Sequence, residues 1–471
     1  MSCSIPPSLG SRFTTLLRSY VQGDGLPFAT VLSEEQIERA AREEGVTFGR
    51  GSNVVYTQAI TLWAFVGQVL AGHNCCVAAV QRVIAMLTAM GRTACSAATG
   101  AYCVARAKLP ESFLRRLTYQ VGSELESQAP AHWRWHNRRV LLADGTSSTL
   151  ADTAENQREY PQPTTQRPGL GFPMIRMVAL LGFATASVVG VAIGRYAGKR
   201  TGETALLRQL LDQLRVGDIV VADRYHCSYF MIVLLMQHGV DVVFRMHHMR
   251  DYDFRRGRRL GRNDHVVEWQ RPQRPTWMDA ATYETVPETL EVRELRFNVE
   301  NPGYRTEEIV VATTLIDDTT YSKEEIADLY HQRWHAELDL RSIKQTLGMD
   351  ELVCKTPAMV RKELWAYLLG YNMVRKVAAQ SAWENKLQPR QLSFAGTLQI
   401  LETFGILLLA MDEGMRRESY HRILVAIAAN RVGDRPGLVE PRRRKRRNDQ
   451  YHMLREPRAQ ARARLLNGGE E

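Results

Sequence analysis

The sequence predicts a multidomain protein of mixed α+β and α/β structure, with a mixed-sheet core between a helical N-terminal domain and a helical C-terminal region. Its 471 residues are enough for about three domains. The hydrophobic fraction of 45% and the charged fraction of 24% are those of an ordinary soluble protein. Helical periodicity dominates the two ends of the chain, whereas short apolar runs typical of buried strands begin near residue 138.

The N-terminal domain, residues 1–135, is predicted to be entirely helical. Ser33 can cap its first clear helix while Gln36 reaches back to the cap. Further helices are predicted at 56–71, 75–90, 93–106 and 111–126. The domain lacks catalytic pairs, so it is either a DNA-recognition unit that places a helix in the major groove or a helical support that touches no base.

Two short apolar runs that each lead to an aspartate define the first part of the core, residues 136–249. Val140–Ala143 precedes Asp144, and Asp218–Ala222 precedes Asp223, as expected of buried strands with an acid at the carboxyl end. Residues 177–194 carry no charge and are about long enough to span a bilayer. The interruption at glycine and small polar residues, followed by β-branched residues, instead predicts two buried strands joined by a tight turn.

The order of elements in this core is informative. Helices at 201–214 and 228–238 and a strand at 240–246 follow the first three strands and enclose the strand that leads to Asp223. This is the ribonuclease-H-like order, a mixed sheet with helices on its faces. In that topology the strands before Asp144 and Asp223 are adjacent and parallel, so their carboxyl ends bring the two acids together.

A β-rich insertion, residues 250–320, is predicted to separate this part of the core from its second part, residues 321–380. The insertion begins with five arginines between residues 255 and 262, and its segments at 266–269, 282–286, 290–299 and 309–315 alternate as strands do. Trp269 and Trp277 can stack on a flipped DNA base or can pack within the protein, and both interpretations are open.

The segment Tyr330–Lys344 carries the most informative spacing in the chain. If it is one helix at about 100° per residue, five of its side chains fall within an arc of roughly 80°. These side chains are Tyr330, Arg333, Glu337, Arg341 and Lys344. One edge of the helix then presents a carboxylate flanked by cations and a phenol. Composition alone favours a solvated face with spaced ion pairs, but the spacing argues against that interpretation.

The spacing Tyr-x2-Arg-x3-Glu-x6-Lys resembles the signature of the bacterial insertion-sequence transposases of the IS-four family, within the Asp-Asp-Glu class. All four positions match, and the resemblance covers about residues 138–372. In that family the glutamate is the third catalytic carboxylate, so the resemblance implies that Asp144 and Asp223 are the first two. It also implies metal-dependent cut-and-paste DNA transposition, an N-terminal domain that recognises the element ends, and a homodimer in the synaptic complex.

Three carboxylates without His or Cys partners form a hard-oxygen site that suits Mg²⁺ or Mn²⁺ rather than zinc. Two such ions can activate a water and stabilise the leaving oxygen of a phosphodiester. We expect Asp144 to contact both ions, and Asp223 and Glu337 to hold one each. The residues expected to bind DNA phosphates are Tyr330, Arg333, Lys344, Arg341 and Arg224. The alternative for Arg224 is a salt bridge to Asp223.

Charge and cysteine usage are consistent with a nucleic-acid partner in a reducing compartment. The net charge of +10 suits a polyanion, and the resemblance implies double-stranded DNA, as terminal inverted repeats and as target. Seven cysteines without a CxxC pair predict reduced thiols, and neither a signal peptide nor a membrane span is predicted. We therefore expect a cytoplasmic protein, and the resemblance implies that the cytoplasm is bacterial and that the protein is associated with the nucleoid.

The C-terminal region is predicted to be helical over residues 381–440 and to end in a basic tail, residues 441–471. Residues 442–447 are all Arg or Lys, so we expect the tail to be disordered until it meets phosphates or to act only as a solubilising tail. Two other functions are open. The chain could be a stand-alone ribonuclease-H-like nuclease, which would not need the basic insertion, or a catalytically inactive DNA-binding transposase derivative, although all three acids are present.

Overall fold

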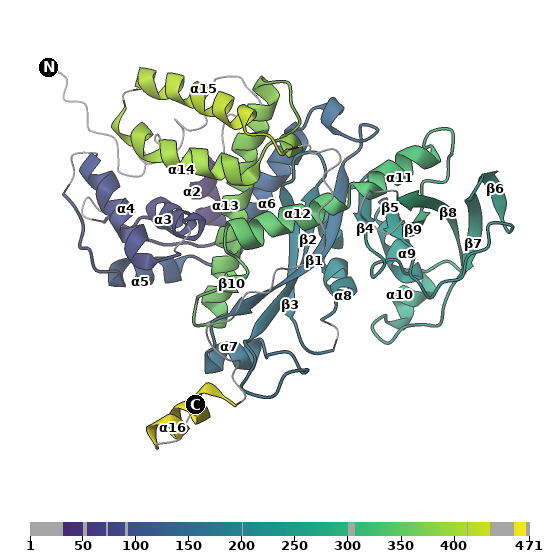
Figure 1. The fold of residues 1–471 in the computed structure, drawn as a ribbon, viewed down its shortest axis with the longest axis horizontal. Coiled ribbons are helices and arrows are strands. Elements are labelled where there is room, and N and C mark those ends of the chain that lie inside the picture. The colour runs from purple at the N-terminus through teal and green to yellow at the C-terminus, as the bar shows by residue number, and fades with distance from the viewer. Residues whose placement is uncertain are drawn as a thin grey trace.

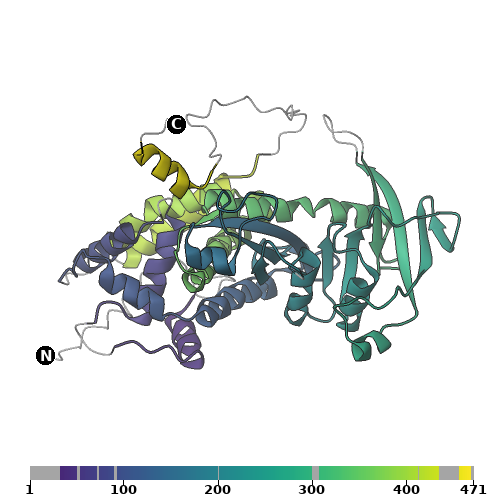
Figure 2. The same cartoon turned by 90° about the horizontal axis from the view of Figure 1, so that it is seen from below.

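The computed structural model describes residues 32–49, 54–71, 74–89, 93–199, 201–299, 307–411, 413–433 and 456–467. One large mixed sheet occupies the centre and right of Figure 1, and helices from both ends of the chain gather on its left. Figure 2 gives the same separation from a second direction. The predicted combination of a mixed sheet with many helices is therefore confirmed.

The described N-terminal part contains α2 (Glu34–Glu43), α3 (Gln58–Leu70), α4 (Cys76–Ala89), α5 (Gly100–Lys108) and α6 (Glu111–Gln128). α2 begins as predicted, because Ser33 Oγ accepts a hydrogen bond from the Gln36 N–H and the Gln36 side chain accepts one from the Ser33 N–H. α3 is buried along nearly its whole length. A helix that is apolar on every side needs neighbours on every side, and α3 packs against α4, α5 and α13 (Pro357–Glu384).

The centre of the sheet consists of β1 (Val140–Leu150), β2 (Met174–Gly182), β3 (Val188–Arg195), β4 (Ile219–Ala222) and β5 (Asp241–Arg245) in the order β3-β2-β1-β4-β5. β1 is antiparallel to β2 and parallel to β4, and β4 is parallel to β5. The uncharged segment 177–194 thus lies in a β-hairpin, as predicted. Because β1, β4 and β5 are parallel, their carboxyl ends point the same way.

The segment 250–320 extends this same sheet. It contributes β6 (Arg258–Gly261), β7 (Asp264–Gln270), β8 (Thr289–Val299) and β9 (Glu307–Thr313), and β9 pairs with β5. The strand predicted at 282–286 is wrong, because α10 (Ala280–Glu284) covers most of that segment. Asp279 caps α10 by accepting a hydrogen bond from the Thr282 N–H at 2.8 Å. The division of the chain into domains stays a prediction.

Helices cover both faces of the central sheet. α6, α11 (Lys323–His331), α12 (Trp334–Arg341) and α13 share one apolar core with strand residues such as Leu142. α8 (Glu203–Leu207) and α9 (Tyr229–Gln237) pack on the other face, against residues such as Leu141. Successive strand residues point to opposite faces, so β1 contributes to both cores and its position is fixed from two sides.

The remaining elements lie around this core. They are α7 (Ala154–Glu159), β10 (Glu351–Leu352), α14 (Phe394–Ala410), α15 (Glu413–Ala429) and α16 (Arg458–Leu466). α16 lies in the tail that was predicted to be disordered, whereas the basic run 442–447 lies outside the described residues. In the parts of the chain that the structure covers, no helix is both long and apolar enough to cross a membrane.

Three other predicted bounds need correction. β1 does not end before Asp144, as predicted, but continues to Leu150, because its second half pairs with β2 and β10. The helix predicted at 201–214 is α8 followed by the 3₁₀ turn Arg208–Gln213. The helix predicted from residue 93 begins only at Gly100.

Candidate active site

Adjacent strands place the two aspartates side by side. Ala143 of β1 pairs with Ala222 of β4 in parallel register. The residue that follows each alanine is an aspartate, so the register places Asp144 beside Asp223. Asp144 Oδ1 accepts a hydrogen bond from the Gly145 N–H at 2.9 Å, and Asp223 Oδ1 accepts one from the Tyr225 N–H at 3.0 Å. The predicted pairing of these two strands is confirmed.

Glu337 reaches the same place from α12. The supposition of one continuous helix over Tyr330–Lys344 does not hold, because α11 ends at His331, α12 begins at Trp334, and a π-helical turn covers Ser342–Thr346. Between α11 and α12 the backbone hydrogen bonds tighten to the i→i−3 pattern, including Ala336 N–H to Arg333 O. α12 is therefore a separate short helix and not a continuation of α11.

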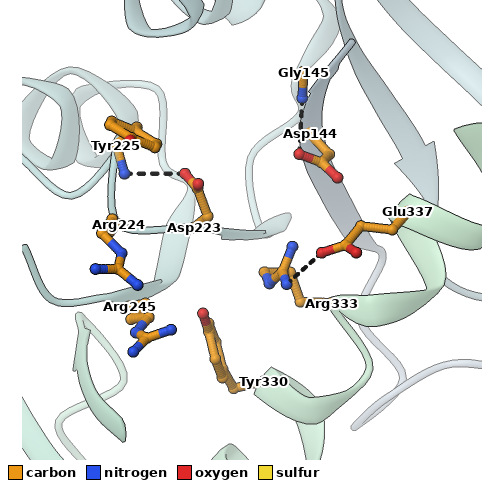
Figure 3. Close-up of a pocket in the computed structure, with 9 residues that line it drawn as sticks. All are labelled: Asp144, Gly145, Asp223, Arg224, Tyr225, Arg245, Tyr330, Arg333 and Glu337. Carbon is orange, nitrogen blue, oxygen red and sulfur yellow. Dashed lines mark hydrogen bonds and ion pairs between the residues drawn. The ribbon is translucent and has the colours of Figure 1, made fainter. Parts of the chain in front are cut away.

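A cavity of about 600 Å³ opens between these elements. Figure 3 shows the three acids arranged around it, with Arg333 extending between them. The lining residues are Asp144, Gly145, Asp223, Arg224, Tyr225, Arg245, Tyr330, Arg333 and Glu337. All three acids that the resemblance singled out thus face one pocket, although they come from three separate elements.

The negative charge in this pocket is poorly compensated at Asp144. Its pKa is raised from 3.8 to about 6, chiefly by burial. The carboxylates of Glu337 and Asp223 add to the increase, while the Gly145 N–H and Arg333 oppose it. A bound cation would favour the ionised form of this carboxyl.

Arg333 and Tyr330 supply hydrogen-bond donors to the pocket. Arg333 Nη2 donates to Glu337 Oε1 at 2.7 Å, one helical turn away. Burial works against the charge of Arg333, but Tyr330, Glu337 and Asp144 outweigh it, so its pKa lies above the usual value. Burial raises the pKa of Tyr330 to about 12, so its phenol is a hydrogen-bond donor at neutral pH.

Two members of the predicted cationic edge lie outside the pocket. Lys344 stands two helical turns beyond Glu337, about 10 Å along an ideal helix axis, and falls in the π-helical turn. Arg341 is exposed, and its Nε donates to Gln345 Oε1 at 2.9 Å. Arg224 does line the pocket, and among the ion pairs of the described residues none joins it to Asp223. Their contacts with DNA stay predictions.

Both predicted stacking tryptophans pack within the protein in this structure. Trp269 is 4% exposed, and its Nε1 donates to Glu294 Oε1 at 2.8 Å while the Arg250 guanidinium lies 3.7 Å from the ring centroid. Trp277 is half-buried, with the Arg208 guanidinium 3.8 Å from its ring centroid. The packing interpretation describes both rings as they stand, and their stacking on DNA is untested.

Sequence reasoning missed four residues in and near the pocket. Arg245 is the last residue of β5, which is parallel to β4. A basic residue at the carboxyl end of such a strand could have been predicted to lie near Asp223. Tyr225 is 66% exposed beside Asp223, and Trp334 is 51% exposed beside Arg333 at the start of α12. Glu203, on α8, gave no such signal, because only the packing of α8 brings it to β1.

Glu203 adds a further carboxylate next to Asp144. A Cβ added to Gly145 would stand 2.3 Å from Glu203 Cδ, so the side chain lies directly against this glycine. Burial raises the pKa of Glu203, and the charge of Asp223 raises it further. A side chain at position 145, within β1, would therefore have to displace the Glu203 carboxylate.

The pocket fits a divalent cation by donor type but not yet by position. Asp144, Asp223 and Glu337 offer the carboxylate oxygens that Mg²⁺ and Mn²⁺ prefer. Within the described ranges, no three Asp, Glu, His or Cys side chains stand close enough to hold one ion. Glu337 is engaged by Arg333, so this side chain would have to turn or share its second oxygen to join the two aspartates.

The chain belongs to the family described as Transposase DDE domain, whose model matches residues 135–373, just over half of the chain. This match spans the two aspartates and Glu337, and it confirms the predicted Asp-Asp-Glu class. The chain is also similar to Transposase InsG for insertion sequence element IS4 of Escherichia coli (strain K12). The two are 27% identical over 303 residues, which cover 63% of this chain and 65% of that protein, slightly less than two thirds of its length.

Among solved structures, the chain is similar to the piggyBac transposase in a cryo-EM structure of its synaptic complex with hairpin DNA. The TM-score is 0.41 at 8% sequence identity, with 90% of this chain and 86% of the other covered. A likeness at this level supports no further conclusion about the site.

Proposed function

We propose that this chain is a DNA transposase that cuts DNA at the ends of an insertion sequence and joins the freed 3′-hydroxyl ends to target DNA. The observation that carries the proposal is that Asp144, Asp223 and Glu337 face one pocket in a chain of the DDE transposase family. The similarity to InsG over 303 residues supports it. The net charge of +10 is consistent with a DNA partner.

The three acids are proposed to hold two Mg²⁺ or Mn²⁺ ions, with Asp144 shared between them. When bound, such ions activate a water and stabilise the leaving oxygen in phosphodiester chemistry. The carboxylate-only donor set suits these ions better than zinc. The raised pKa of Asp144 supports the proposal, because a carboxyl in this state gains most from a nearby cation.

The cationic side of the pocket is proposed to bind the DNA backbone. Arg333 has five N–H donors and commits one Nη to Glu337, so the others can contact a phosphate. Arg245 and Arg224 line the same cavity, and Tyr330 can donate a hydrogen bond to a phosphate oxygen. Trp334, exposed beside Arg333, is better placed to stack on a base than the buried Trp269 or the half-buried Trp277.

The architecture supports a ribonuclease-H-like core. The strands run in the order β3-β2-β1-β4-β5, with β3, β2 and β1 antiparallel and β1, β4 and β5 parallel. The adjacent, parallel pairing of β1 with β4 is the part of this arrangement that the sequence predicted for that fold. By family resemblance, the helical part before residue 135 is proposed to recognise the terminal inverted repeats. A homodimer is proposed for the synaptic complex, and the bacterial cytoplasm, with nucleoid association, for the location.

The proposal is tested by incubating the full chain with DNA that carries its element ends and with Mg²⁺ or Mn²⁺. We expect nicks at the ends, 3′-end joining to a second DNA, and loss of both products in Asp144→Ala. The control is Glu155→Ala, which removes an exposed carboxylate on α7 outside the pocket and should keep both products. Hairpin ends on the element would add a hairpin step to the reaction.

Each outcome ranks the three functions. Cleavage without joining would favour a stand-alone nuclease, and binding without cleavage would favour an inactive DNA-binding derivative. Cleavage that persists in Asp144→Ala would refute the assignment of this pocket as the active site.

A further inference from the structure

α12, the short helix that carries Glu337, gains little stability from its own backbone hydrogen bonds. It contains eight residues and stands between a tightened turn and the π-helical turn Ser342–Thr346. A helix of this length is marginal on its own. Tertiary contacts must therefore decide where α12 lies, and with it where the carboxylate of Glu337 points.

A buried ionic cluster holds the side of α12 that faces away from the pocket. Asp339 lies two residues after Glu337, about 200° around an ideal helix, and is 2% exposed. Its Oδ1 accepts a hydrogen bond from Arg375 Nη2 at 2.8 Å, and its Oδ2 accepts one from Arg390 Nη1 at 2.9 Å. Both oxygens of Asp339 are thus committed to cations.

Arg375 links this cluster to α13 and to the turn between β2 and β3. It belongs to α13 and is 5% exposed. Its Nε donates to the hydroxyl oxygen of Tyr371 at 2.9 Å, and the Tyr371 hydroxyl donates to the Ala186 carbonyl oxygen at 3.0 Å. Ala186 lies in the β2–β3 turn, so one end of the cluster is anchored there.

Arg390 reaches the same turn from the 3₁₀ turn that follows α13. It donates through Nη2 to the Gly182 carbonyl oxygen at 2.8 Å and through Nε to the Phe183 carbonyl oxygen at 2.6 Å. Gly182 ends β2, the strand that pairs with β1 and places Ala179 opposite Asp144. The cluster therefore connects the helix of Glu337 to the strand beside Asp144.

We propose that Asp339 is a positioning residue, which through Arg375 and Arg390 fixes α12 against α13 and the β2–β3 turn so that Glu337 faces Asp144 across the pocket. The inference rests on the proposed function. Asp339 is buried and does not line the pocket, so it acts only through Glu337. A buried ionic cluster is weak evidence for added stability, because desolvation costs offset the attraction, and fixing one arrangement is its best-supported use.

The chain offers a matched control for a purely structural ion pair. Asp264 of β7 accepts hydrogen bonds from Arg293 of β8 at 2.8 and 2.6 Å, and the two side chains are 5% and 1% exposed. β7 and β8 contribute no residue to the pocket. Asp264→Asn and Asp339→Asn thus each neutralise a buried carboxylate that is hydrogen-bonded to arginine, Asp264 to one arginine and Asp339 to two, and only the second lies on α12.

The test is the affinity of the full chain for Mn²⁺, measured without DNA by the electron paramagnetic resonance signal of the free ion. We expect Asp339→Asn to weaken Mn²⁺ binding about 10-fold or more, as loss of a supporting contact does, and Asp264→Asn to change it less than about 2-fold. In the Glu337→Gln background, Asp339→Asn should have almost no further effect, because it acts through Glu337.

Cleavage of element-end DNA gives a second measurement. Asp339→Asn should lower kcat about 10- to 100-fold, since a misplacement of about 1 Å costs this much, with KM for DNA changed less than about 3-fold. If Asp339→Asn does not fold, Arg390→Lys keeps the charge but loses the donors to the β2–β3 turn, and about 3-fold weaker Mn²⁺ binding is expected.

The possible failures are distinct. If Glu337→Gln weakens Mn²⁺ binding but Asp339→Asn does not, or if Asp339→Asn acts equally in both backgrounds, the positioning role is refuted while the proposed function stands. If Asp264→Asn weakens Mn²⁺ binding as much as Asp339→Asn, the cluster is only structural. If Glu337→Gln leaves Mn²⁺ binding unchanged, the metal assignment in the proposed function fails and the role of Asp339 fails with it.

Discussion

Asp144→Asn is expected to stabilise the metal-free protein at neutral pH. The pKa of Asp144 is about 6 in the folded chain against an ordinary 3.8, so the folded state resists ionisation of this carboxyl. The resulting penalty is absent below pH 3.8, grows as the pH rises toward 6, and is complete above it. At 1.36 kcal/mol per pH unit, the full penalty is about 3 kcal/mol. Asparagine carries no charge and escapes it.

Urea denaturation in the presence of a chelator measures this effect. Linkage gives a penalty of about 1 kcal/mol at pH 4.5 and about 3 kcal/mol at pH 7.5, so the advantage of Asp144→Asn should grow by about 2 kcal/mol between them. Saturating Mn²⁺ should reduce the difference at pH 7.5, because the ion compensates the wild-type carboxylate.

Asp253→Asn is the control with the opposite sign. Hydrogen bonds from Arg255 hold the pKa of Asp253 at about 2, below the ordinary 3.8, so its ionised form favours folding. This contribution grows between about pH 2 and 4 and is complete above that range, so Asp253→Asn should destabilise the chain equally at pH 4.5 and at pH 7.5. An advantage of Asp144→Asn that is equal at pH 4.5 and 7.5 would refute the reasoning, because it would mean that the charge of Asp144 is already compensated in the folded chain.

Three further outcomes follow from the pocket. Gly145→Ala should cost about 1–3 kcal/mol in denaturant unfolding, because its Cβ would stand 2.3 Å from Glu203 Cδ, and Glu203→Ala in the same chain should restore most of the loss. Trp334→Ala should weaken binding to DNA with an unpaired end by about 1–3 kcal/mol in fluorescence anisotropy, whereas Trp277→Ala should not. Arg333→Lys should lower kcat/KM for end cleavage about 10- to 150-fold, the equivalent of one charged hydrogen bond of about 1.5–3 kcal/mol; an unchanged value would remove Arg333 from the site.

The sheet and its two aspartates were predictable because the signals are local. An apolar run followed by an acid marks a buried strand and its carboxyl end, and the parallel pairing of β1 with β4 then follows from the order of elements. The hairpin in residues 177–194 was predictable for the same reason, since a glycine and small polar residues interrupt an apolar run that is too rich in β-branched residues for a helix.

The environment of Glu337 was not predictable, because partners distant in sequence decide it. α12 lies between the tightened turn and the π-helical turn, and neither turn changes the periodicity of the side chains. That periodicity alone would predict one longer helix. Asp339 accepts hydrogen bonds from arginines on α13 and on the turn after it. Glu203 contacts Gly145 only because α8 packs against the sheet. Arg245 is different, since its place at the end of β5 was open to the reasoning that found Asp223.

In the structure, the Arg-Glu part and the Glu-Lys part of the Tyr-Arg-Glu-Lys spacing have different roles. Arg-x3-Glu is an ion pair at 2.7 Å inside the pocket, whereas Glu-x6-Lys would place Lys344 about 10 Å farther along the axis of an ideal helix. That distance equals about three base-pair steps of 3.4 Å, so a duplex running along α12 would meet Lys344 about three steps from the pocket.

Lys344→Gln should therefore weaken DNA binding alike for all sequences and reduce the slope of log K against log salt by about 0.9, the share of one phosphate contact. The rate of cleavage of already bound DNA should change less than about 3-fold, because Lys344 does not line the cavity. Arg333→Gln, the comparison inside the pocket, should reduce that rate. An unchanged salt slope together with a lost cleavage rate would place Lys344 in the chemistry and contradict the separation drawn from α12.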